Sequence, residues 1–98
     1  MKKINMIGFD IEKSEKAVID RIIKTYGKKI EREIGGSWAL VLRLKKSKHG
    51  KAFLHEIMGK IMSNKKVFNS KTSDYNLFFA VSETLEKLLN EIKHKMRK

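Results

Sequence analysis

The side chains with the clearest chemical potential in this sequence are cations that recur at helical spacing. One set lies within a narrow arc of a predicted helix and comprises Arg21, Lys24, Lys28 and Arg32. A second set, near the end of the chain, comprises Lys87, His94, Lys95, Arg97 and Lys98 together with the neutral Asn90, and Glu83 is its main interruption. Lysine and arginine bind nucleic acids chiefly by neutralising phosphates and releasing the counterions that those phosphates held. The two surfaces therefore predict a large anionic partner, with these ten residues as the candidate binding site.

The chain as a whole is basic, which favours the same interpretation. Among 98 residues, 23 lysines and arginines outnumber 11 aspartates and glutamates, and the formal net charge is +12. Such an excess destabilises a compact state through self-repulsion, so it is usually retained for binding. Nucleic acid is the first candidate partner and an anionic membrane surface is the second. The longest apolar run, Trp38–Leu42, is too short to cross a bilayer, and we expect a soluble, cytoplasmic protein without a secretory signal.

No arrangement typical of an active site or a metal centre occurs in the sequence. The three histidines, His49, His55 and His94, are widely spaced, and we expect them to face solvent or RNA. The absence of cysteine excludes a disulfide framework and a thiolate zinc site. No Gly-x-Ser-x-Gly turn supplies a nucleophile, and Gly35-Gly36 lacks the remaining residues of a phosphate-binding loop. We predict a protein that is not an enzyme, with no catalytic residue, metal, cofactor or small-molecule substrate.

Hydrophobic periodicity predicts one domain with the element order β-α-β-β-β-α. Strands are expected at residues 3–8, 38–45, 53–62 and 67–72. The first helix is expected to run from an N-cap at Ser14 to a stop at Gly35-Gly36, and the second from about Asn76 to the end of the chain. The acid-free segment 45–51 is interpreted as a hairpin connection and 63–66 as a turn. Because Gly59 and Lys60 blur the alternation of the third strand, its register stays open.

Each predicted helix combines an apolar stripe with a basic face on the opposite side. The stripes are formed by Ile19, Ile22, Ile23, Tyr26, Ile30 and Ile34 in the first helix and by Leu77, Val81, Leu85, Leu88, Ile92 and Met96 in the second. A sheet with both helices on one face would bury the stripes and leave the basic faces in water. The predicted fold class is therefore α+β, a four-stranded sheet with two helices packed on one face. Trp38 is expected to anchor the core, and Phe79 is expected to pack against a neighbouring loop.

Two short motifs stand in a fixed order along the chain. Asn5-Met6-Ile7-Gly8 closes the first predicted strand ahead of Ser14, and Asn76-Leu77-Phe78-Phe79-Ala80-Val81-Ser82 opens the last helix ahead of Glu86-Lys87-Leu88. Together with the element order, they resemble the short-type ribosome hibernation-promoting factors, of the group of the ribosome-associated inhibitor and sigma-54 modulation proteins. The chain departs from that family at Asn76 and Ser82, where the family has acidic residues, at Phe78, where it has tyrosine, and at Asn90, where it has a basic residue.

The resemblance implies a single ribosome-binding domain over residues 1–98, without the second, dimer-forming domain of the long family members. It implies binding to small-subunit rRNA near the decoding centre, across the sites used by tRNA and mRNA. Such binding would inhibit translation in stress or stationary phase. It also implies a ribosome-associated cytoplasmic protein. We expect the protein to be monomeric when free and the ten residues named first to bind RNA. Phosphate contacts are expected from Arg21, Lys24, Lys28, Lys87, His94, Arg97 and Lys98.

Two other classes of protein fit part of the sequence. A double-stranded RNA-binding domain has a similar α-β-β-β-α order, but such domains lack a leading strand and carry a lysine cluster at the start of the last helix. The segment 76–82 contains neither lysine nor arginine. A basic regulatory module that docks on an acidic protein or on anionic lipid is the other alternative, and the salt dependence of RNA binding would distinguish it.

Overall fold

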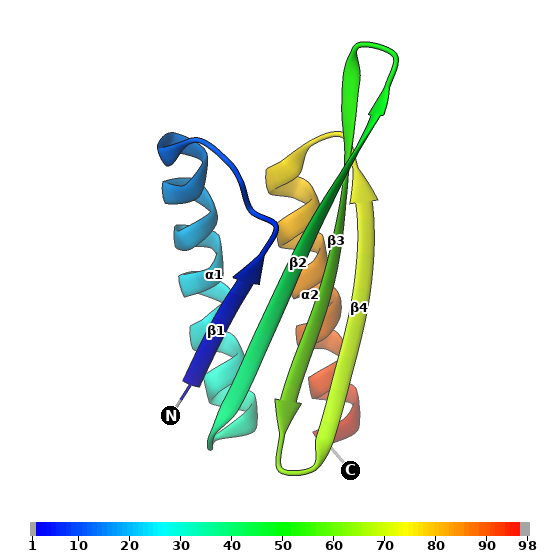
Figure 1. Cartoon of the computed structure of the whole chain (residues 1–98). Coiled ribbons are helices and arrows are strands. Elements are labelled where there is room, and N and C mark those ends of the chain that lie inside the picture. The colour runs from blue at the N-terminus through cyan, green and yellow to red at the C-terminus, as the bar shows by residue number, and fades with distance from the viewer. Residues whose placement is uncertain (1, 97–98) are drawn as a thin grey trace.

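A computed structural model of the chain describes residues 2–96, and for Met96 it describes the backbone alone. The elements follow the predicted order (Figure 1). They are β1 (Lys2–Ile7), α1 (Lys13–Ile34), β2 (Trp38–His49), β3 (Ala52–Ser63), β4 (Lys66–Asp74) and α2 (Leu77–Met96).

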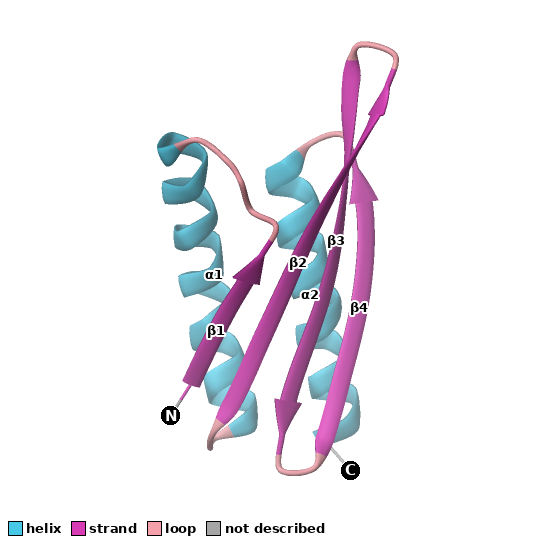
Figure 2. Cartoon of the chain, viewed as in Figure 1, coloured by secondary structure: helices cyan, strands magenta, loops and turns pink. Residues whose placement is uncertain are grey.

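The four strands form one sheet in the order β1-β2-β3-β4. β1 runs parallel to β2, with Lys2 opposite Trp38, while β2, β3 and β4 are successively antiparallel. Because β1 and β2 are parallel, the chain between them must cross over the sheet, and α1 makes this crossover. Both helices cover the same face and leave the other face open (Figure 2), which confirms the predicted α+β architecture.

The core lies between the helices and the inner face of the sheet. In α2 the predicted stripe residues Leu77, Val81, Leu85, Leu88 and Ile92 are all buried. In α1, Ile19, Ile23 and Ile30 are buried, while Ile22, Tyr26 and Ile34 pack partly buried around them. The strands contribute Trp38, Leu40, Leu42, Leu44, Ile57, Ile61 and Phe68. Trp38 is only 3% exposed and does anchor the core, as its position predicted.

The ends of the helices follow local capping chemistry. The prediction that Ser14 caps α1 is wrong, because the N-cap is Glu12. The Glu15 carboxylate accepts the backbone N–H of Glu12 at 3.2 Å, the reciprocal bond of a capping box. At the other end, Gly35 adopts the left-handed conformation (φ 71°) and confirms the predicted stop. The start predicted for α2 is also confirmed, since Asn76 Oδ1 accepts the N–H of Phe79 at 3.0 Å.

The second and third strands are longer than the sequence indicated. Segment 45–51 was expected to be a connection, but β2 continues to His49 and β3 resumes at Ala52, so only Gly50 and Lys51 form the turn. Gly50 has φ 64°, which suits a two-residue hairpin turn. The prediction was wrong because this segment lacks apolar alternation, and cross-strand backbone pairing extends it instead.

Gly59 interrupts the alternation of β3 because α2 approaches the sheet there. A Cβ atom at this position would lie 2.7 Å from Thr84 Cγ2 and 2.8 Å from Leu88 Cδ1. Thr84 and Leu88 are fully buried in α2, so neither can move aside freely. The glycine therefore permits the close contact between helix and sheet.

We predict that Gly59→Ala lowers the free energy of unfolding by about 1–3 kcal/mol, because it overpacks this contact. Urea denaturation followed by the fluorescence of Trp38, the single tryptophan, measures the change. Adding Thr84→Ser, which removes one clashing methyl group, should restore part of the loss. Gly36→Ala is the matched control, since no atom lies within 4 Å of the Cβ position there. Equal stability of the two alanine variants would contradict this account of Gly59.

Candidate nucleic-acid interface

The basic face of α1 is directed away from the sheet. Arg21, Lys24, Lys28 and Arg32 are all exposed, on the side of the helix opposite the buried Ile19, Ile23 and Ile30. The acidic residues beside this face are engaged elsewhere. Asp20 forms an ion pair with Lys16 at 3.3 Å, and Glu31 accepts a hydrogen bond from the indole N–H of Trp38 at 2.8 Å. The four cations therefore present a surface with little local neutralisation.

The candidate residues of α2 divide into two groups. Asn90 and His94 are exposed on the side away from the sheet. Lys87 and Lys95 lean toward β4 instead. The Lys87 ammonium donates to the carbonyl oxygen of Lys71 at 3.0 Å.

Lys95 forms an ion pair with Glu91 at 3.2 Å, and its Nζ lies 5.7 Å from the centre of the Phe68 ring. These contacts draw both lysines toward the sheet edge rather than toward α1. Arg97 and Lys98 lie outside the described residues.

An acidic contact joins the two helices. The phenol of Tyr26 on α1 donates to Glu86 Oε1 on α2 at 2.8 Å. Burial, this hydrogen bond and the negative charges of Glu86 and Glu83 raise the pKa of Tyr26 from 10.0 to about 12. The helices thus lie side by side as the sequence predicted, but carboxylates lie between their basic faces. An anionic partner would meet two separate cationic surfaces.

The remaining histidine and aromatic candidates differ from their predicted settings. His55 is half-buried, and its Nδ1 is buried without a hydrogen-bond partner among residues 2–96, so the expectation of a solvent-facing or RNA-facing side chain is wrong for this atom. Phe79 is 52% exposed, so any packing against a neighbouring loop leaves about half of the residue in water. Within residues 2–96, no group of three or more histidine, cysteine, aspartate or glutamate side chains could hold a metal ion.

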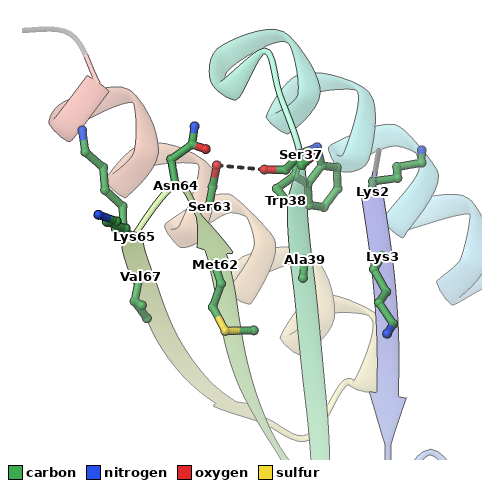
Figure 3. A pocket seen from close by; sticks show the side chains of 11 residues that line it. Lys2, Lys3, Ser37, Trp38, Ala39, Met62, Ser63, Asn64, Lys65 and Val67 are labelled. Carbon is green, nitrogen blue, oxygen red and sulfur yellow. Dashed lines mark hydrogen bonds between the residues drawn. The ribbon is translucent and has the colours of Figure 1, made fainter.

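A hollow of about 550 Å³ lies at the end of the sheet where β1, β2 and β4 begin and β3 ends (Figure 3). Its lining includes the apolar Ala39, Met62 and Val67 together with lysines. The hydroxyl of Ser63 donates to the carbonyl oxygen of Ser37 at 3.0 Å. Histidine, aspartate and glutamate are missing from the described lining.

The open face of the sheet is a further basic surface that the sequence reading did not single out. Arg43 on β2, Met58 on β3 and Lys71 on β4 are opposite one another and exposed, and Lys60 lies one pleat away. Together with Val41 and Asn69 they line a second hollow of about 630 Å³. The sequence feature that could have revealed this surface is the alternation of β3, in which Met58, Lys60 and Met62 share one face. Gly59 obscured that alternation.

The same fold occurs in two solved structures of low sequence identity. One is the N-terminal domain of Protein Y from Thermus thermophilus, with 11% identity, a TM-score of 0.69, and coverage of 97% of this chain and 99% of that domain. The other is a ribosomal subunit interface protein from Coxiella burnetii, with 12% identity, a TM-score of 0.63, and coverage of 99% of this chain and 98% of that protein. No protein-family model and no curated protein sequence matches the chain. No helix within residues 2–96 is long and apolar enough to span a membrane.

The Tyr26–Glu86 contact leads to a prediction about pH. Because the pKa of Tyr26 is raised in the folded protein, its contribution to stability is complete below pH 10 and is lost as the pH rises from about 10 to about 12. In a Tyr75→Phe variant, which leaves Tyr26 as the only tyrosine, the ultraviolet absorbance of tyrosinate should therefore titrate near pH 12. Tyr26→Phe should lower the free energy of unfolding by about 1–2 kcal/mol at neutral pH. An ordinary titration near pH 10 would show that the bond between the helices does not form.

Proposed function

We propose that this protein binds the small ribosomal subunit through its rRNA, near the decoding centre, and inhibits translation by covering the tRNA and mRNA sites. The observation that carries the proposal is a fold shared over 99% of the chain with a protein described as a ribosomal subunit interface protein. The family resemblance of the opening and closing motifs supports it independently of the fold.

The charge distribution supports RNA as the partner. Folded RNA is recognised largely through its backbone and shape. Rigid helices bearing exposed arginine and lysine suit that kind of recognition better than a base-reading loop. We assign the first phosphate contacts to Arg21, Lys24, Lys28 and Arg32, whose cations are exposed on one face of α1. Asn90 and His94 contribute a polar surface on α2, and Lys87 and Lys95 would reach RNA that passes along the β4 edge. Arg97 and Lys98 remain proposed contacts from the sequence alone.

A double-stranded RNA-binding domain is a weaker candidate. The leading strand β1 pairs with β2 over six residues and is an integral part of the sheet. The start of α2 contains Leu77, Phe78 and Phe79 in place of a lysine cluster. A regulatory module that docks on an acidic protein or on anionic lipid would need the same cations, so the choice between these partners is left to the binding experiment.

We predict that the triple variant Arg21→Glu, Lys24→Glu, Lys28→Glu binds purified small ribosomal subunits much more weakly in co-sedimentation. The slope of log affinity against log salt should fall by about 2–3, since each lost phosphate contact removes about one unit. Co-sedimentation at two salt concentrations gives both the affinity and its salt slope. The emission of the buried Trp38 reports whether the variant is folded.

The matched control reverses Lys3, Arg43 and Lys60 on the open face of the sheet, with the same change in net charge. It should retain most of the binding. Binding that survives in the folded helix variant and disappears in the control would remove the helix faces from the mechanism. Preference of the wild-type protein for anionic vesicles over ribosomal subunits would overturn the proposal itself.

A further inference from the structure

The hairpin between β2 and β3 extends beyond the rest of the sheet. β1 ends opposite Arg43 and β4 ends opposite His55, so the pairs Ser47–Leu54, Lys48–Phe53 and His49–Ala52 have no neighbouring strand on either side. We call residues 47–54 the hairpin arm. At about 3.3 Å per residue it projects by roughly 12 Å. Figure 1 shows the arm reaching past the starts of both helices, with its turn at the tip in Figure 2.

The arm is basic and carries no acidic residue. Lys48, His49 and Lys51 lie in it, Lys45 and Lys46 lie at its base, and all five are exposed. The first acidic residue after them is Glu56, whose carboxylate is paired with Lys71 at 3.2 Å. Protruding ribbons usually carry few apolar side chains, because water surrounds both faces. Lysine on an unpaired strand also prevents edge-to-edge aggregation, and that is the simplest explanation of these residues.

Exposed aromatic rings on the arm and beside it go beyond what edge protection requires. Phe53 is 50% exposed, and its cross-strand partner is Lys48. Alternation along the strands puts Lys46, Lys48 and Phe53 on the face of the hairpin that the helices cover lower down, because Leu44 and Ile57 on that face are buried. On the other face, Tyr75 is 57% exposed and meets the His49 ring edge-on, with 6.5 Å between the ring centres. Resistance to aggregation alone does not require a large exposed ring directly opposite Lys48.

We propose that the hairpin arm binds single-stranded RNA, with an unpaired base stacked on Phe53 and the adjacent phosphates held by Lys46 and Lys48. Proteins that bind single strands combine an aromatic platform with cations that follow the backbone. The arm and its base supply both on one face, where Lys48 lies directly across the ladder from the ring and Lys46 lies at the base. The inference rests on the proposed function in one respect, namely that RNA is the partner. It adds a contact remote from the helix faces and a preference for unpaired nucleotides.

Fluorescence anisotropy with two labelled RNAs tests the proposal, one an unstructured uridine-rich strand and the other a perfect duplex of equal length. Phe53→Leu keeps an apolar side chain and removes the aromatic ring. It should weaken single-strand binding about five-fold or more and leave duplex binding unchanged. Lys46→Gln with Lys48→Gln should reduce the salt slope for the single strand by about 1.4, or 0.7 for each phosphate contact. Lys3→Gln with Lys60→Gln, on the open face of the sheet, is the matched control and should not discriminate between the RNAs.

Single-strand affinity that is unchanged in Phe53→Leu would overturn the proposal, whatever the lysine variant does. Equal losses for both RNAs would also overturn it, since they would indicate only general electrostatic attraction. Aggregation of the Lys46 and Lys48 variant with normal RNA binding by its remaining monomer would assign those lysines to edge protection. Co-sedimentation with small subunits separates the two proposals. If the wild-type protein does not bind subunits but Phe53→Leu weakens single-strand binding, the hairpin-arm proposal stands and the ribosomal function is overturned. If the wild-type protein binds subunits but Phe53→Leu has no effect, the ribosomal function stands and the hairpin-arm proposal is overturned.

Discussion

The contact between α2 and the inner face of the sheet is the constraint on which the rest of the structure depends. The helix buries a full stripe from Leu77 to Ile92. Gly59 has no side chain, so α2 can lie close to β3 at this position. With apolar burial contributing about 25 cal/mol for each Å², this interface supplies much of the stability that offsets the self-repulsion of a chain with a net charge of +12. Because both helices occupy one face, the cations of α1 and the polar end of α2 are left in water on the same side.

Acidic residues decide how continuous those basic surfaces are. Glu86 accepts a hydrogen bond from the phenol of Tyr26, and Glu31 accepts one from the indole N–H of Trp38. Each carboxylate therefore serves a structural contact rather than pairing with a surface lysine. Engagement of Glu31 leaves the α1 cations less neutralised. Glu86 has the opposite consequence, because it sets negative charge between the helices. A polyanion that spans both helices would therefore approach two separate ridges of positive charge.

The hairpin arm and the open face of the sheet extend the positive surface around the molecule. The arm gains its length from backbone pairing alone, beyond the last partners of β1 and β4. Exposed Arg43, Lys60 and Lys71 line the open face between exposed methionines. Exposed cations therefore lie on several sides of the molecule.

The sequence by itself determined the element order, the two apolar stripes, the stop at Gly35 and the start of α2 at Asn76. Periodicity and capping are local properties, which is why the residues within one element were enough to predict them. Only the tertiary structure decided the directions of Lys87 and Lys95, the carboxylate between the helices and the reach of the hairpin. The direction of a long side chain on the flank of a helix depends on which carbonyl, carboxylate or ring a neighbouring element brings near it. For Lys87 that neighbour is Lys71 and for Tyr26 it is Glu86, 16 and 60 residues away along the chain.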